Sequence, residues 1–333
     1  MKHILSGDIG GTKTRLALVD VTGTQVHIRH EISYPSRDFP LFETLLGEFL
    51  SGVDANIHAA FGIAGPVQGR VVQTTNLPWR IDANILQRQF GFLSCNLLND
   101  LEATAYGLPA LRDADLLTLQ SGLPGACGNE AVIAAGTALG EAGLYWDGHQ
   151  HQPFATEGGH TSFSPGNELE FAFLCYLQRQ YQHVSWERVV SGMGLVSLHE
   201  FLCAYRQTPV PNELAEEMRN GDAGAVIANA ALTKRDAICV ETLDWFVRLY
   251  GAEAGNVALK VMSRGGLYLG GGIAPKILPL LQTGDFLKAF LNKGRMRPLL
   301  EAMPVKVILN DRAALFGTAL YAARMLGNAT GIE

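Results

Sequence analysis

Short apolar runs in this chain alternate with stretches whose apolar residues recur at helical spacing. Residues 3–5 and 16–19 are apolar runs on either side of a glycine-rich turn, which predicts two strands joined as a hairpin. Residues 42–50 carry apolar side chains at helical period, so a helix is expected there. Because strand-like and helix-like segments continue to alternate along the chain, we expect an α/β fold.

The later segments repeat this alternation. Further strands are predicted at residues 25–28, 57–67, 95–98, 131–135, 267–269 and 305–309, and helical segments at residues 81–86, 101–106, 223–232, 238–249 and 312–326. Ser185 fits the N-cap of one more helix, with Glu187 in its first turn. That structural role for Glu187 competes with a role in binding a ligand.

The turn of the first hairpin combines glycines, threonines and a carboxylate, in the order Ser6-Gly7-Asp8-Ile9-Gly10-Gly11-Thr12-Lys13-Thr14-Arg15. Glycine permits unusual backbone angles and close approach by a ligand, and successive backbone N–H groups form a cradle for phosphate. The hydroxyls of Thr12 and Thr14 add donors. Asp8 would repel a phosphate unless a cation lay between them, and Mg²⁺ is the natural choice. An ordinary hairpin turn is the competing interpretation.

A second hairpin repeats this scheme at residues 131–146, where an apolar run, a Gly136-Thr137 turn and another apolar run follow one another. Two such hairpins suggest a duplicated α/β unit. Each half would offer one phosphate-binding turn, so that a nucleotide tail could lie in the cleft between them. Gly270, Gly271 and Gly272 follow a predicted strand and precede a helix start, which suits close contact with an adenine and its ribose.

Polar residues with candidate chemistry stand apart from these turns. Asn99 and Asp100 end a buried strand, where an α/β sheet presents side chains to its ligand, although Asp100 could equally cap the following helix. Glu157 and His160 lie in a Glu-Gly-Gly-His loop and could hold hydroxyl groups. His149 and His151 lie two residues apart, but no third metal ligand accompanies them.

Length and composition limit the possible functions. A chain of 333 residues suggests two domains, and 47% hydrophobic with 17% charged residues is typical of a globular protein. A net charge of −6 without any basic cluster argues against nucleic acid as a partner. Five scattered cysteines without a C-x-x-C pair fit a reducing cytoplasm and argue against structural zinc. Neither a signal peptide nor a membrane-spanning segment is expected.

Taken together, these motifs resemble the bacterial glucokinase family of the enteric type, within the hexokinase–actin–chaperone ATPase superfamily. The resemblance runs almost end to end and rests on the segments 7–12, 62–66, 76–79, 98–100, 136–140, 157–160, 187–188 and 269–274. It implies a two-domain actin-like ATPase fold of the ribonuclease H type, with the active site in the interdomain cleft. The small domain would be residues 1–110 completed by residues 301–333, and the large domain would be residues 111–300.

The resemblance also implies roles for individual residues. The reaction would be ATP-dependent phosphorylation of glucose at the 6-hydroxyl, feeding glycolysis, with Asp100 as catalytic base. Glucose would be bound by Asn99, Asp100, Glu157, His160 and Glu187. Mg²⁺ would be held by Asp8, through water. Mg-ATP would be bound by Asp8, Ile9, Gly10, Gly11, Thr12, Lys13, Gly136, Thr137, Gly270, Gly271 and Gly272. A cytoplasmic homodimer is expected, without nucleic acid or membrane partners.

Three positions depart from the family pattern: Lys13, Ser162 and Met193 stand where Asn, Asp and Pro are usual. None has an assigned chemical role except Lys13, which lies in the phosphate turn. Three alternatives stay open: a related hexose or amino-sugar kinase, a non-catalytic sugar sensor, and an actin-like or chaperone ATPase. The absence of a cysteine-rich zinc motif favours the glucokinase branch over the related repressor-type sugar kinases.

Overall fold

The computed structural model describes residues 2–53, 56–74 and 77–329. It divides into two compact units: Met1–Asp115 with Pro153–Ala155 and Asn310–Glu333, and Leu116–Gln152 with Thr156–Leu309. The boundaries therefore lie near residues 115 and 309, whereas we expected them near 110 and 300. Of the motif at residues 76–79, Asn76 lies outside the described residues.

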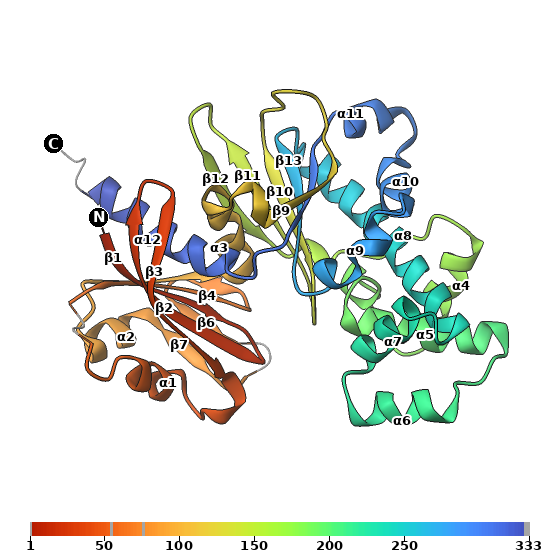
Figure 1. Ribbon diagram of the computed structural model, residues 1–333, viewed down its shortest axis with the longest axis horizontal. Helices are drawn as coiled ribbons and strands as arrows, with labels where there is room; N and C mark the ends of the chain where they lie inside the picture. Colours follow the sequence, from red (N-terminus) through yellow and green to blue (C-terminus); the bar gives the residue numbers. More distant parts are fainter. Residues whose placement is uncertain (1, 54–55, 75–76, 330–333) are drawn as a thin grey trace. The chain divides into compact units, whose positions relative to one another are not determined.

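The first unit is built on a five-stranded mixed sheet in the order β3-β2-β1-β4-β8 (Figure 1). Its strands are β1 (Lys2–Ile9), β2 (Lys13–Thr22), β3 (Gln25–Pro35), β4 (His58–Ile63) and β8 (Ser94–Asn99), and a small second sheet contains β5 (Val67–Gln68), β6 (Val71–Gln73) and β7 (Arg80–Asp82). β1 and β2 form the predicted antiparallel hairpin, while β1, β4 and β8 run parallel. The carboxyl ends of these three strands therefore meet at one edge of the sheet.

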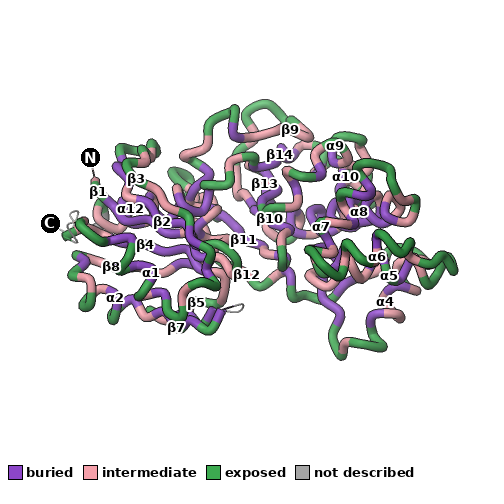
Figure 2. Tube along the Cα trace, turned by 60° about the horizontal axis from the view of Figure 1, so that its bottom comes forward, coloured by how far each residue is buried: buried purple, intermediate pink, exposed green. Residues whose placement is uncertain are grey.

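Helices cover both faces of this sheet. Side chains alternate between the two faces along each strand, and apolar residues on both faces are buried beneath helices. They are α1 (Phe42–Phe49), α2 (Ala83–Phe90), α3 (Asp100–Gly107) and α12 (Ala313–Ala329). On β1, Ile4 is buried with residues of α3 and α12, and the next residue, Leu5, is buried with residues of α1 and α2. Burial falls from the central strands to the outer strand β3, which is largely exposed (Figure 2).

The second unit is built on a six-stranded sheet in the order β12-β11-β10-β13-β14-β9. Its strands are β9 (Leu116–Gln120), β10 (Glu130–Ala135), β11 (Leu139–Trp146), β12 (His151–Thr156), β13 (Gly266–Gly270) and β14 (Val305–Ile308). Of β12, residues Pro153–Ala155 are grouped with the first unit. β10 and β11 form the second predicted hairpin, and β13 lies parallel to β10 on its other side. The carboxyl ends of β10 and β13 are therefore neighbours.

A helical layer packs against this second sheet (Figure 1). Its α-helices are α4 (Glu168–Leu177), α5 (Gly192–Arg206), α6 (Asn212–Asn220), α7 (Ala223–Leu232), α8 (Ala237–Val261), α9 (Leu278–Leu281), α10 (Asp285–Leu291) and α11 (Arg297–Glu301). The long helix α8 lies against β10, and the Tyr250 hydroxyl donates to the Ile133 carbonyl at 3.2 Å. This buried hydrogen bond ties the helix to the strand that ends in the Gly136-Thr137 turn.

One predicted helix is wrong. The segment after Ser185 makes only a 3₁₀ turn, Trp186–Arg188, and the Ser185 side chain makes no capping hydrogen bond. The helix instead begins six residues later as α5, where the Ser191 hydroxyl accepts the N–H of Gly194 at 3.1 Å. Glu187 therefore does not lie in the first turn of an α-helix, and its side chain is available for other contacts.

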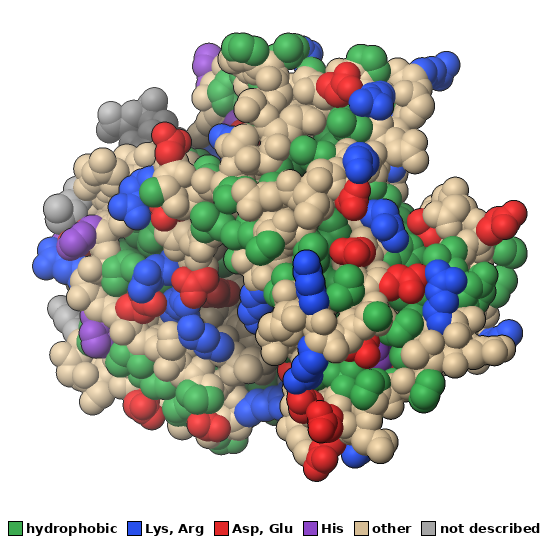
Figure 3. All heavy atoms as spheres, turned by 45° about the vertical axis from the view of Figure 1, so that its right-hand side comes forward, with side chains coloured by type: hydrophobic (Ala, Val, Ile, Leu, Met, Phe, Trp, Pro, Cys, Tyr) green, Lys and Arg blue, Asp and Glu red, His purple; other side chains and the backbone are tan. Residues whose placement is uncertain are grey.

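The surface carries charged side chains of both signs, as the composition indicates. On the face drawn in Figure 3, Lys and Arg side chains are interspersed with Asp and Glu rather than gathered together. Among the described residues, every helix is too short or too polar to cross a bilayer.

Candidate active site

The register of the first sheet brings two of the predicted carboxylates to the same edge. Asp8 on β1 pairs with Gly62 on β4, and Gly62 pairs with Leu98 on β8. Two strand spacings separate the backbones of Asp8 and Leu98 by roughly 10 Å. Because Asp100 follows Leu98 by two residues, its carboxyl group lies on the same edge as that of Asp8.

Asn99, rather than Asp100, caps helix α3. Its Oδ1 accepts the N–H groups of Leu101 at 2.9 Å and Glu102 at 3.4 Å, and its Nδ2 donates to the Gly65 carbonyl at 3.3 Å. Asp100 is the first residue of the helix, where the helix dipole favours a negative charge. Its Oδ1 also accepts the Leu101 N–H, at 3.0 Å. The capping function is therefore already supplied by its neighbour.

The charges around Asp8 do not balance. Its cross-strand partner Arg15 is held by Asp311, with Nη2 to Oδ2 at 2.6 Å, and by Glu31, with Nε to Oε1 at 3.3 Å. Burial and, after it, the negative charge of Asp100 raise the pKa of Asp8 from 3.8 to about 6, against a smaller lowering by Arg15. A divalent cation at this edge would compensate the surplus negative charge and restore the ionised form of Asp8.

The first glycine turn is braced from one side. The Gly10 N–H donates to the Lys13 carbonyl at 3.0 Å, and the Ser36 hydroxyl donates to the Gly10 carbonyl at 2.7 Å. The expectation that Thr14 offers its hydroxyl to phosphate is not supported, because this side chain is buried and its Oγ1 lies 2.9 Å from the Ser36 hydroxyl. Thr12 and Lys13 are exposed, so their side chains can reach a ligand.

The glycine turns of the second unit lie side by side. Gly270 on β13 pairs with Ala134 on β10, and the N–H of Ile273 donates to the Ala135 carbonyl at 3.2 Å. The turn at Gly136 is held in place because its carbonyl accepts the Gly192 N–H at 2.8 Å. The Gly136-Thr137 turn and the three glycines from Gly270 thus share one edge of this sheet, as a phosphate site beside a nucleoside site requires.

The predicted sugar-binding residues of the second unit also lie on adjoining segments. Glu157 precedes a 3₁₀ turn, Gly158–His160, and the side chains of Glu157 and His160 are exposed with Oε2 and Nε2 3.8 Å apart. The Trp186 N–H donates to the Thr161 carbonyl at 3.0 Å, which joins this loop to the segment carrying Glu187. These contacts bring together three of the five predicted sugar ligands.

Glu187 is positioned by the strand that leaves the phosphate turn. Its Oε2 accepts the N–H of Leu139, the first residue of β11, at 3.3 Å. The backbone carbonyl of Glu187 accepts the Ser191 hydroxyl at 2.6 Å. The sugar residues and the phosphate turn of the second unit therefore share one backbone framework. The sequence held no signal for this link, because it depends on a long-range hydrogen bond to a backbone N–H.

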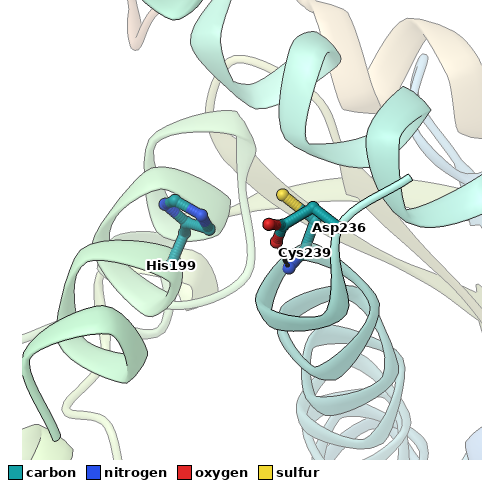
Figure 4. A group of neighbouring side chains, drawn as sticks. All are labelled: His199, Asp236 and Cys239. Atoms are coloured by element: carbon teal, nitrogen blue, oxygen red, sulfur yellow. Dashed lines mark hydrogen bonds between the residues drawn. The ribbon is translucent and has the colours of Figure 1, made fainter. Parts of the chain in front are cut away.

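A different cluster could hold a metal by residue type alone. His199 on α5, Cys239 on α8 and Asp236, which precedes α8, bring donor atoms within 4.8 Å of one another (Figure 4). Helix capping accounts for Asp236, whose Oδ1 accepts the Cys239 N–H at 2.8 Å. His199 contacts the sulfur of Cys203 at 3.8 Å. These local contacts explain the arrangement without an ion. His151, in the other pair considered, contacts the Gly128 carbonyl through Nε2 at 3.0 Å.

Comparison with known proteins places the chain in a known family. The glucokinase family model matches residues 5–325. A glucokinase of Nostoc punctiforme is 45% identical over 341 residues, covering 98% of this chain and 100% of the relative. A crystal structure of a glucokinase from an Antarctic psychrotroph has a TM-score of 0.84 and 30% identity, covering 97% of this chain and 99% of its own.

A more distant structure shares the fold. It is a ROK-family glucokinase from Streptomyces griseus, solved with glucose and AMPPNP, with a TM-score of 0.65, 22% identity, and coverage of 97% of this chain and 99% of its own. Sequence similarity over nearly the whole chain and the mixed α/β architecture thus lead to one conclusion. The chain belongs to the glucokinase family and is a kinase that phosphorylates glucose.

Proposed function

We propose that this protein transfers the γ-phosphoryl group of ATP to the 6-hydroxyl of glucose, with Asp100 as the general base. The observation that carries the assignment is the position of Asp100, which directly follows the partly buried strand β8 while Asn99 supplies the helix cap. An alcohol is a weak nucleophile at neutral pH, so a carboxylate that accepts its proton accelerates transfer by roughly 10²–10⁴-fold.

Asp8 is the residue we assign to Mg²⁺, through a bound water. The surplus of carboxylates around it, and the engagement of Arg15 by Asp311 and Glu31, support this assignment. When bound, Mg-ATP supplies the phosphoryl group with its charge partly neutralised by the cation. Asp8 would orient that cation. In this role its own ionised form would be stabilised.

The two glycine turns are assigned to the phosphates. The first comprises residues 9–13 and the second Gly136 and Thr137. The N–H groups of Gly10 and Gly136 donate within their turns, so the exposed threonines and the remaining N–H groups of the turns would bind the phosphates. Gly271 and Gly272 are exposed beside the second turn, which supports their assignment to adenosine. These groups would hold the nucleotide still, so that the phosphoryl group and the sugar hydroxyl stay in line.

Glucose is assigned to Glu157, His160 and Glu187 of the second unit and to Asn99 and Asp100 of the first. Carboxylates accept and an amide or imidazole N–H donates, which suits the several hydroxyls of a hexose. Because both units contribute residues, we propose that the active site forms in a cleft between them. The ATP analogue and glucose in the Streptomyces griseus relative support both ligands for this chain.

A coupled assay of ADP release tests the proposed reaction. With Mg-ATP, glucose should give sustained ADP release and glucose 6-phosphate as the product. Faster turnover of fructose, mannose or an amino sugar at equal concentration would point to a related hexose kinase. ADP release without any sugar would point to a chaperone-like or filament ATPase, and glucose binding without turnover would point to a sugar sensor.

We also propose that the protein acts in the cytoplasm as a homodimer and supplies glycolysis. The scattered cysteines, without a C-x-x-C pair, support a reducing compartment, and the family resemblance supports the dimer. Light scattering of the purified protein at micromolar concentration tests the dimer, since a monomer mass would contradict it.

A further inference from the structure

Two buried carboxyl groups that the proposed reaction does not use face each other in the second unit. Glu141 lies on β11 and Glu253 on α8, with relative exposures of 5% and 0%. Their side chains are within hydrogen-bonding reach of each other. If both side chains are ionised, the Oε1 atom of each carboxylate receives no hydrogen bond. Two carboxylates can only accept, so a single proton between them would satisfy this contact.

The surroundings of the pair favour a negative charge on Glu253 rather than on Glu141. The Asn256 amide donates to Glu253 Oε2 at 2.7 Å, and Lys260 Nζ lies 3.6 Å from Glu253 Oε1. Lys293, after α10, donates to Asn256 Oδ1 at 2.6 Å and adds a second positive charge. Burial, and then the charge of Glu253, raise the pKa of Glu141 to about 8. The amide and the ammonium group beside Glu253 therefore favour the proton on Glu141.

Glu141 is also the support of the proposed sugar loop. A Cβ placed on Gly158 would lie 1.8 Å from Glu141 Oε2, so the carboxyl group occupies the space against this glycine. The Thr156 hydroxyl donates to the Glu141 carbonyl at 2.9 Å, and the Gly158 N–H donates to the Thr156 hydroxyl at 3.2 Å. The backbone of Glu141 is thus hydrogen-bonded to the start of the loop, and its carboxyl group packs against the turn at Gly158.

We propose that Glu141 and Glu253 form a proton-sharing carboxyl pair that positions the Glu157–His160 loop for sugar binding. Both are positioning residues, since neither is placed in contact with the sugar. Loss of the shared proton would leave two buried like charges. Their repulsion would displace Glu141 against Gly158 and distort the loop. The inference rests on the proposed assignment of this loop to glucose.

The shared proton can be tested without turnover. At pH 7 the infrared spectrum of the wild type should contain the C=O band of a protonated, buried carboxylic acid, and Glu141→Gln and Glu253→Gln should each remove it. Glutamine keeps the size of the side chain and donates an amide N–H permanently, so both variants should fold. A wild-type spectrum without this band, or a band that survives both substitutions, would overturn the pair.

The role in sugar binding is tested by the pH dependence of KM. In the wild type, KM for glucose should rise as the pH increases through about 8, while KM for Mg-ATP changes little. Glu141→Gln should abolish this rise. Glu130→Gln is the matched control, a half-buried acid at the other end of the same sheet, and should retain it. A flat glucose KM between pH 7 and 9 in an active wild type would overturn the positioning role.

A double-mutant cycle tests the contact with the loop itself. Gly158→Ala should raise KM for glucose by about tenfold or more, because its methyl group collides with Glu141. In a Glu141→Ala background that collision is removed, so the same substitution should have a much smaller effect. Equal effects in the two backgrounds would show that Glu141 does not support the loop. A wild type that fails to phosphorylate glucose at all would overturn the proposed function instead.

Discussion

Asp8 is half-buried beside a negative neighbour, and Arg15, its partner across the hairpin, is engaged elsewhere. Arg15 is bound by Asp311 and Glu31, while Asp100 lies on the same sheet edge. A carboxylate in this position costs stability when no cation is bound. We interpret this arrangement as one that lowers the stability of the ligand-free protein and favours the proposed binding of Mg²⁺.

The Asp8→Asn variant should separate stability from function. The pKa of Asp8 is raised from 3.8 to about 6, so the native state binds more protons than the unfolded state between these values, and stability falls as the pH rises through them. At pH 7 the ligand-free variant should therefore be more stable than the wild type, by up to about 3 kcal/mol, with no difference below pH 4. Thermal melts across this range measure it.

The same variant should lose Mg-ATP use while retaining glucose binding, because its amide cannot replace a carboxylate beside Mg²⁺. Calorimetry with glucose and kinetics with varied Mg-ATP make the comparison. Equal loss of both ligands would indicate a merely structural Asp8, and a ligand-free melting temperature below that of the wild type at pH 7 would contradict the charge argument.

A substitution of His160 tests the proposed sugar site of the second unit. Its side chain is exposed, whereas its backbone N–H donates to the Glu157 carbonyl at 3.0 Å, so the loop does not need the imidazole to keep its shape. His160→Ala should raise KM for glucose by about tenfold or more while KM for ATP stays near its wild-type value. His149→Ala, an exposed histidine in the β11–β12 turn, is the control. An unchanged KM for glucose would remove His160 from the sugar site.

For single residues, the sequence indicated which side chains carry unusual chemistry better than it indicated which residues they contact. Asp8 could be singled out because a carboxylate within a phosphate-type turn requires an explanation. Glu141 and Glu253 could not, because nothing in the local pattern of β11 or α8 indicates that two acids meet across the interior. The capping role of Asn99 was also missed, since Asn and Asp cap helices about equally well and only the hydrogen bonds distinguish them.

Among the elements, the glycine turn after β13 has two glycines with different physical roles. Gly271 has φ of +80°, and a Cβ there would lie 2.3 Å from the Ala135 carbonyl oxygen, whereas a Cβ on Gly272 would meet nothing within 4 Å. Gly271→Ala should therefore destabilise the protein by roughly 1–3 kcal/mol or more, measured by denaturant unfolding.

Gly272→Ala is the matched variant and should melt like the wild type. If adenosine lies against this turn, the added methyl group should raise KM for ATP while leaving KM for glucose unchanged. Wild-type kinetics for Gly272→Ala would exclude close approach of the nucleoside, and wild-type stability for Gly271→Ala would contradict the strain argument.

The regular elements were predicted well where one pattern dominated. Both hairpins are present because apolar strands flank glycine turns, and the 223–232 helix has the predicted bounds as α7. The prediction failed after Ser185, where a serine before an acidic residue resembles a cap. Backbone hydrogen bonds to residues 161 and 163 hold that segment extended at its start, so tertiary contacts override the local preference.

On the scale of the whole molecule, the assigned residues are divided between two compact units. The first unit carries the residues proposed as base and Mg²⁺ ligand, and the second carries most of the residues proposed to bind the sugar and the nucleoside. We therefore expect glucose to bring the units together and exclude water from the reacting groups. Saturating glucose should reduce the radius of gyration in X-ray scattering and slow proteolysis. Superimposable scattering curves would contradict closure.

The most direct measurement is kcat together with the melting temperature of Asp100→Asn. Asn99 caps α3, so the substitution leaves the cap in place and the melting temperature should stay near that of the wild type. As the general base, Asp100 should contribute roughly 10²-fold or more to kcat, which Asn cannot supply because it accepts no proton. Glu102→Gln, in the first turn of the same helix, should keep wild-type kcat. A stable Asp100→Asn enzyme with wild-type kcat would contradict the account.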